Sequence, residues 1–186
     1  MSSGIERERR FIVDGRGDKP WREHGRTVSI QQYYLPTESI ILQDKTLYYE
    51  GQEITALSDE DAGLFAEHSD WVVRLRKWDE AHIISAKSKI SDEAAFEIEQ
   101  HIGASAARTI LSDGPFPSVQ KTRYLWTSEE EYLWEIDEYE GALAGLILAE
   151  VEFGDTQEVT IIPAWCSLEV TNISSWSNAS LAKMLS

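Results

Sequence analysis

Acidic residues recur along this chain in pairs separated by a single position. In a β-strand such residues point to the same face, because successive side chains alternate. Two carboxylates about 7 Å apart on one face are unfavourable unless they are solvated, paired with bases or bound to a metal ion. The acids with this spacing are Glu6 and Glu8, Glu97 and Glu99, Glu135 and Asp137, and Glu150 and Glu152, with Glu169 alone in a further apolar segment. A solvated outer face explains any one of these strands, but their repetition favours an interior lined by carboxylates.

Basic residues show the same spacing. Guanidinium groups bind phosphate oxygens in pairs, and a lysine adds a point charge. A less specific reading is charge balance, because acids and bases often pair across neighbouring strands on a solvated sheet. The basic residues at candidate positions are Arg10, Arg74, Arg76, Lys87, Lys121 and Arg123.

A cavity lined by carboxylates requires cations, and the oxygen donors suit a hard divalent ion such as Mg²⁺ or Mn²⁺. Zinc is not indicated, because the four histidines show no ligand spacing with one another. Cys166 is the only cysteine, which excludes an internal disulfide and a site built from several thiolates.

The net charge of −16 disfavours nucleic acid and anionic lipid as non-specific partners. It leaves room for a small anion in a locally basic cavity. No apolar run approaches the roughly 20 residues needed to span a bilayer, and the polar start lacks the apolar core of a signal peptide. We therefore expect a cytoplasmic protein that binds neither membrane nor nucleic acid, as a monomer or homodimer.

Most segments alternate with period two, which predicts many strands and few helices. One domain over residues 1–186 is expected, with an insertion near 36–69. Helices are predicted at 58–67, 104–111 and 177–185. The predicted strands span 5–13, 27–35, a hairpin over 39–50, 71–78, 82–88, 95–102, 119–126, 132–139, 144–153 and 165–171. This composition is typical of a barrel or sandwich.

In these segments the chain resembles the CYTH domain proteins, also called triphosphate tunnel metalloenzymes. The opening Glu6-Arg7-Glu8-Arg9-Arg10 is similar to the family's Glu-x-Glu-x-Lys strand. The ordered matches continue through Val73-Arg74-Leu75-Arg76, Ala86-Lys87-Ser88, Phe96-Glu97-Ile98-Glu99, Lys121-Thr122-Arg123-Tyr124, Trp134-Glu135-Ile136-Asp137, Ala149-Glu150-Val151-Glu152, Leu168-Glu169-Val170-Thr171 and the closing segment with Asn178.

The resemblance implies an all-β dominated (α+β) fold, a closed eight-stranded antiparallel β-barrel with a few short peripheral helices. It implies Mg²⁺ or Mn²⁺ as cofactor, and a small ligand such as tripolyphosphate, a nucleoside triphosphate or a cyclic nucleotide. Glu6, Glu8 and Lys87 are implied as catalytic residues. The implied phosphate-binding residues are Arg10, Arg74, Arg76, Lys87, Lys121 and Arg123. The implied metal ligands are Glu6, Glu8, Asp137, Glu150, Glu152 and Glu169, with Glu97, Glu99 and Glu135 as further tunnel residues.

Three positions where the family often has a cation are neutral here, at Gln31, Ala95 and Ser175. The first hypothesis is a metal-dependent phosphohydrolase acting on inorganic tripolyphosphate or a related organic triphosphate. The second is a non-catalytic nucleotide or cyclic-nucleotide binder, in which Tyr33 and Trp176 stack on a base. Trp176 packing the closing helix onto the barrel is the simpler alternative. A class IV adenylate cyclase is the third hypothesis.

Overall fold

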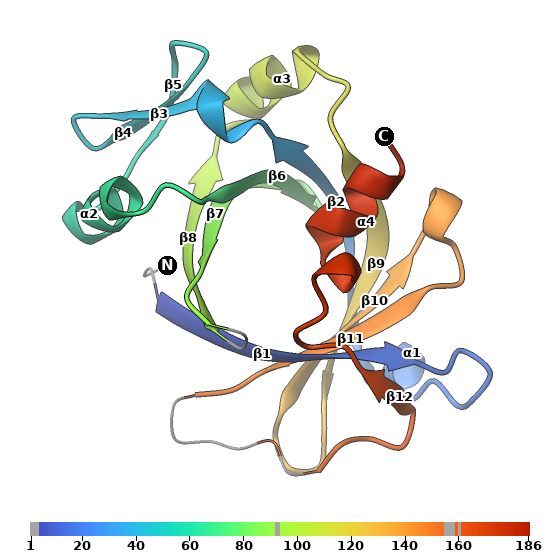
Figure 1. Ribbon diagram of the computed structural model, residues 1–186. Helices are drawn as coiled ribbons and strands as arrows, with labels where there is room; N and C mark the ends of the chain where they lie inside the picture. The colour runs from blue at the N-terminus through green and yellow to red at the C-terminus, as the bar shows by residue number, and fades with distance from the viewer. Residues whose placement is uncertain (1–3, 92–93, 155–158, 160) are drawn as a thin grey trace.

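Eight antiparallel strands close into a barrel in the computed structural model, which describes residues 4–91, 94–154, 159 and 161–186 (Figure 1). Around the barrel the order is β1-β8-β7-β6-β2-β9-β10-β11, and pairing of β11 with β1 closes the ring. The strands are β1 (Gly4–Val13), β2 (Arg26–Leu35), β6 (Val72–Trp78), β7 (Ala81–Lys89), β8 (Ala94–Ile102), β9 (Ser118–Thr127), β10 (Leu133–Tyr139) and β11 (Ile147–Glu152). The predicted barrel is confirmed.

Strand β1 is the seam of the barrel. Its first half pairs with β8, while its second half lies between β11 on one side and the short β12 (Cys166–Glu169) on the other. The register sets Arg10 opposite Glu150 and Glu8 opposite Glu152. Residues directly opposite each other in an antiparallel pair share a face, so these four side chains all face the barrel interior.

The strands carry their apolar residues outward and their charged residues inward. In β6, Val73 and Leu75 are buried in a core outside the barrel, whereas Arg74 and Arg76 line the interior. Alternation allows both faces to be buried only because other elements cover the outside. The charged interior therefore depends on this outer packing.

One outer cover is the segment between β2 and β6. It forms η1 (Thr37–Ser39), the three-stranded sheet β3 (Ile40–Gln43), β4 (Thr46–Tyr49) and β5 (Gln52–Ala56), and helix α2 (Asp59–Glu67). Ser58 caps α2 by accepting from the backbone N–H of Asp61 at 3.0 Å. Together with α3 (Ala104–Ser112), this segment shares one core with the outer face of β6, β7 and β8. The expected helices at 58–67 and 104–111 are confirmed.

A second outer core covers β1, β10 and β11. The short α1 (Trp21–His24) brings Trp21 against Trp165, with ring centroids 5.0 Å apart, and Trp165 also contacts Trp126 and Trp134. Trp21 donates from Nε1 to Glu138 at 2.9 Å, which ties α1 to β10. These aromatic contacts hold the outside of the wall that carries Glu135 and Glu150.

The C-terminal helix α4 (Asn178–Met184) packs at one mouth of the barrel, on the side of β2 and β9 (Figure 1). It follows η3 (Ser174–Trp176), while η2 (Gly141–Leu143) precedes β11. Leu181 and Ala182 are buried against Tyr34, Val119, Tyr139 and Leu148. Asn178 shares this helix face through its i, i+3 and i, i+4 spacing with the two apolar residues. Among the described residues, no helix is long and apolar enough to cross a membrane.

Candidate active site

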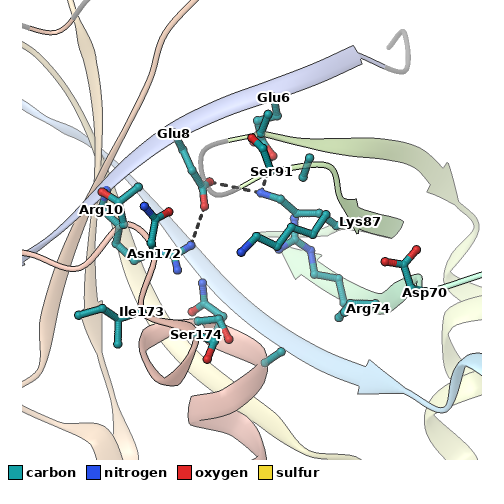
Figure 2. A pocket seen from close by; sticks show the side chains of 18 of the residues that line it. Glu6, Glu8, Arg10, Asp70, Arg74, Lys87, Ser91, Asn172, Ile173 and Ser174 are labelled. Carbon is teal, nitrogen blue, oxygen red and sulfur yellow. Dashed lines mark hydrogen bonds and ion pairs between the residues drawn. The ribbon is translucent and has the colours of Figure 1, made fainter. Parts of the chain in front are cut away.

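The barrel holds two adjoining cavities. The inner cavity, about 250 Å³, is lined mainly by charged side chains from the barrel strands. The mouth cavity, about 290 Å³, opens beside α4 and has a mixed lining that includes Tyr34, Val72, Ala95 and Ile173 (Figure 2). Six residues line both cavities, namely Glu6, Glu8, Arg10, Arg74, Lys87 and Asn178.

Where the cavities meet, acids and bases of three strands form a chain of ion pairs. Lys87 Nζ lies 2.6 Å from Glu6 Oε2 and 3.3 Å from Glu8 Oε2. Arg10 donates to Glu8 at 2.8 Å and to Glu150 at 2.6 Å. Figure 2 shows Glu8 between Lys87 and Arg10, with all three side chains pointing into the cavity. The strand-face prediction for these residues is met.

The paired arginines of β6 differ in how well their charge is compensated. Arg74 donates to Glu97 at 2.6 Å and to Ser85 Oγ at 2.7 Å. Arg76 lies 3.3 Å from Glu99, but its buried Nε has no partner among the described residues. Burial and the nearby Arg74 lower the pKa of Arg76 to about 10. An undercompensated buried guanidinium is costly, and an anionic ligand would relieve that cost.

The opposite wall contains a fully buried network. Arg123 donates to both oxygens of Asp137 at 2.7 Å and to Glu150 at 3.2 Å, and it also pairs with Glu135. Lys121, only 1% exposed, pairs with Asp137. Burial lowers the pKa of Lys121 to about 8, against the opposing effect of Asp137.

The carboxyl groups of β1 and β8 are crowded. Burial, together with the neighbouring Glu97, raises the pKa of Glu6 to about 9. Glu97 shows the opposite outcome, because Arg74 lowers its pKa to about 2 although burial alone would raise it. Glu6, Glu8 and Glu97 thus place three carboxyl groups on one side of the inner cavity, where a bound cation would reduce their mutual repulsion.

This group of carboxyl oxygens fits a hard divalent cation. Within residues 4–91, 94–154, 159 and 161–186, no three His, Cys, Asp or Glu side chains already converge on one point, and most tunnel acids contact a base instead. The donors nearest the seam, Glu6, Glu8, Glu150 and Glu152, nevertheless supply oxygen ligands only, which Mg²⁺ and Mn²⁺ prefer. Glu152 is exposed at the edge of the inner cavity.

Two predicted metal ligands lie elsewhere. The register places Glu169 opposite Phe11, whose ring belongs to the outer core, so Glu169 points outward and pairs with Arg9 at 2.6 Å. Asp137 is buried with Lys121 and Arg123 and does not line either cavity. The remaining predicted tunnel residues, Glu97, Glu99 and Glu135, do line the inner cavity.

The three neutral positions also differ in placement. Ala95 lines the mouth cavity, but Gln31 does not, because the register pairs the inward Gln32 with Arg76. Ser175 is exposed and lines neither cavity, and neither do Trp176 and Tyr33. Trp176 packs with Leu181 and Ala182, so the simpler alternative for this residue is met.

For several lining residues, strand alternation does not predict a place in the cavity, although the resemblance includes the segment with Asn178. Tyr34, Gln32 and Asn178 are inward because of strand register and helix placement. Gln32 donates to Tyr34 Oη at 2.7 Å, and Asn178 reaches into the barrel from α4. Period-two alternation alone does not reveal which face is inward.

Two curated proteins are similar to this chain in sequence. The chain is 31% identical over 115 residues to an inorganic triphosphatase of Acetivibrio thermocellus, covering 61% of this chain and 73% of that protein. It is 39% identical over 66 residues to an inorganic triphosphatase of Nitrosomonas europaea, covering 34% and 44% of the two chains. No family model matches the chain.

Solved structures share the whole fold. The structure of the inorganic triphosphatase NE1496 superposes with a TM-score of 0.57 at 26% identity, covering 95% of this chain and 93% of that one. A second structure, described as the hypothetical protein NE1496, gives a TM-score of 0.58 at 24% identity with 95% and 97% covered. On its fold, its ionic interior and its relatives, this chain belongs to the CYTH, or triphosphate tunnel, family.

Proposed function

We propose that this protein is a divalent-metal-dependent phosphohydrolase that cleaves inorganic tripolyphosphate or a related organic triphosphate inside the barrel. The observation that carries the proposal is the convergence of cations on the inner cavity around an undercompensated Arg76. The relatives named inorganic triphosphatase support the same reaction class.

The chain's own residues supply binding and alignment. Arg74 and Arg76 approach from β6, Lys87 from β7 and Arg123 from β9, so a phosphate chain in the inner cavity meets cations from several sides. Phosphoryl transfer depends mainly on charge neutralisation and alignment of the attacking and leaving oxygens. A row of fixed cations inside the barrel serves both needs.

The acids of the seam complete the site. Glu6, Glu8, Glu150 and Glu152 would hold Mg²⁺ or Mn²⁺, which when bound neutralises phosphate charge and polarises the bond that breaks. Lys87 links Glu6 and Glu8 and keeps both carboxylates oriented toward the cavity. In the reaction a water oxygen bonds to the terminal phosphorus, the bond to the bridging oxygen breaks, and orthophosphate and the shortened polyphosphate leave.

The binding-module hypothesis remains as a second candidate because the mouth cavity includes uncharged side chains such as Tyr34, Val72 and Ile173. Such a lining suits the base or sugar of a nucleotide. Adenylate cyclisation has no separate support in these side chains.

Phosphorus NMR together with the change in Tm distinguishes the three candidate functions, which are triphosphate cleavage, cyclisation and binding without turnover. Tripolyphosphate, ATP and thiamine triphosphate are incubated with the protein and Mg²⁺ or Mn²⁺. Conversion of tripolyphosphate to pyrophosphate and orthophosphate supports the proposal, and cyclic AMP from ATP supports the cyclase. If nothing is converted while nucleotides raise Tm, the protein is a binder and the proposal is wrong. A ligand at 100 times its Kd stabilises by about 2.7 kcal/mol.

A further inference from the structure

Asn178 is a polar residue on the buried face of α4 that lines both cavities. Its side chain is 8% exposed. The other residues shared by the two cavities are Glu6, Glu8, Arg10, Arg74 and Lys87, all of them charged. Asn178 therefore places a neutral amide where the inner cavity opens into the mouth cavity.

The orientation of this amide is fixed by its neighbours. Asn178 Oδ1 accepts from Lys121 Nζ at 3.3 Å and from the hydroxyl of Tyr139. An ammonium group only donates hydrogen bonds, so the amide oxygen must face Lys121. The amide nitrogen lies on the opposite side of the group, and it donates no side-chain hydrogen bond within the part of the chain that the structure describes.

Because this nitrogen is not one of the buried polar atoms left without a partner, its two N–H groups are accessible to a ligand in the cavity. The acceptor that a site of this kind would receive is a phosphate oxygen, because fixed cations surround the same space. Arg10 and Lys87 hold charge at the junction, and Lys121 stands behind the amide oxygen.

We propose that the Asn178 side chain is a substrate-binding residue whose amide N–H groups donate to an oxygen of the phosphate chain at the junction of the two cavities. The inference rests on the proposed triphosphate-cleaving function for its ligand. It adds a directional contact from the C-terminal helix to a site whose other contacts come from barrel strands. It also makes the seating of α4 a condition for full affinity.

The test separates donation to the ligand from anchoring of the helix. Asn178→Asp keeps an oxygen acceptor for Lys121 and Tyr139 but removes the donors, whereas Asn178→Ala removes both. We expect both variants to raise KM for tripolyphosphate at least about tenfold, as for loss of a hydrogen bond to a charged group, with a smaller change in kcat. Only Asn178→Ala is expected to lower Tm.

A matched control measures the effect of the charge change alone. Lys183→Gln changes the charge of the same helix by the same one unit, at an exposed residue that lines neither cavity, and leaves Asn178 intact. Its KM should stay within about threefold of the unchanged protein. The proposal is overturned if Asn178→Ala also stays within threefold, or if Lys183→Gln weakens binding as much as Asn178→Asp.

A second readout is independent of turnover. The apparent Kd of tripolyphosphate is taken from the concentration dependence of Tm in EDTA. Both Asn178 variants should raise this Kd, and the variant with the larger rise in KM should show the larger rise in Kd. Unchanged affinity in both variants would overturn the inference. If the unsubstituted protein binds tripolyphosphate without cleaving it, the proposed function fails while this comparison still decides the role of Asn178.

Discussion

Arg10 of β1 and Glu150 of β11 lie directly opposite each other across the seam that closes the barrel, joined by a hydrogen bond of 2.6 Å. Glu150 also accepts from Arg123 at 3.2 Å, and Arg10 also donates to Glu8 at 2.8 Å. The contact that closes the barrel is therefore part of the site. Closure and ligand binding draw on the same buried charges.

Removing the Glu150 carboxylate should weaken both the closure of the barrel and the binding of the ligand. Glu150→Ala leaves Arg10 and Arg123 each short of a buried partner, a change that costs about 3–5 kcal/mol. For a domain of this size that corresponds to a fall in Tm of roughly 6–20 °C. Calorimetry of the metal-free protein measures the shift. A Tm within about 2 °C of the unchanged protein would show that the seam pair contributes little.

Glu152 is the matched acid on the same strand face. It is exposed, so Glu152→Gln should leave Tm within about 2 °C. If Glu152 holds the divalent ion, the Mg²⁺ concentration for half-maximal phosphate release should rise about 10-fold or more, within the range for losing a carboxylate ligand. Titration of activity with Mg²⁺ measures this. An unchanged Mg²⁺ requirement would remove Glu152 from the metal site.

Substitution of Arg76 tests whether a residue that binds the anion lowers the stability of the free protein. Its Nε has no partner among the described residues, and its neighbours include the like-charged Arg74. Arg76→Met should leave Tm unchanged or higher, while KM for tripolyphosphate rises about 10- to 100-fold. Arg74→Met is the control, because Arg74 is well paired with Glu97 and Ser85 and its loss should lower Tm. A large fall in Tm for Arg76→Met would mean that Arg76 is structural.

Asp137 should behave as a structural acid. It joins Lys121 to Arg123 in a fully buried network and lines neither cavity. Asp137→Asn should lower Tm by roughly 6 °C or more, because two buried cations lose their countercharge. The Mg²⁺ concentration for half-maximal activity should stay within about twofold. A selective rise in that concentration, with Tm unchanged, would return Asp137 to the metal ligands.

Glu138 should contribute to the fall of protein stability at acidic pH. Although burial opposes it, hydrogen bonds from Arg22 and Trp21 lower the pKa of Glu138. A carboxyl with a lowered folded-state pKa contributes stability above its unfolded pKa, near 4.5, and loses that contribution as pH falls through the folded value. Glu138→Gln should therefore show a smaller loss of Tm between pH 6 and pH 3. Equal slopes in the two proteins would argue against this linkage.

Much of the fold follows from alternation along the sequence. The barrel strands match their predicted spans within a few residues, because inward charges alternate with outward apolar residues. Strand β5 lies outside the predicted strands, because Gln52 to Ala56 has no fully buried residue and only Ile54 packs against the outer core. The four-residue α1 is too short to give a helical period.

The site was less predictable, because alternation does not say which face is inward. Glu169 and Glu150 occupy similar apolar strands, yet the register places one opposite Phe11 and the other opposite Arg10. For the same reason, alternation does not show that Gln32, rather than its neighbour Gln31, faces the barrel interior. Asn178 reaches the cavity from a helix, so no strand pattern could identify it.

The most direct test of the central claim is the initial rate of phosphate release from tripolyphosphate, measured with Mg²⁺, with Mn²⁺ and with EDTA. The proposed function predicts turnover with at least one of the two metals and none with EDTA. It also predicts a fall of about 10²-fold or more in Glu6→Gln, since one electrostatic contact to a reacting centre is typically worth that much. A folded protein that releases no phosphate under any of these conditions, or releases it equally well in EDTA, would contradict it.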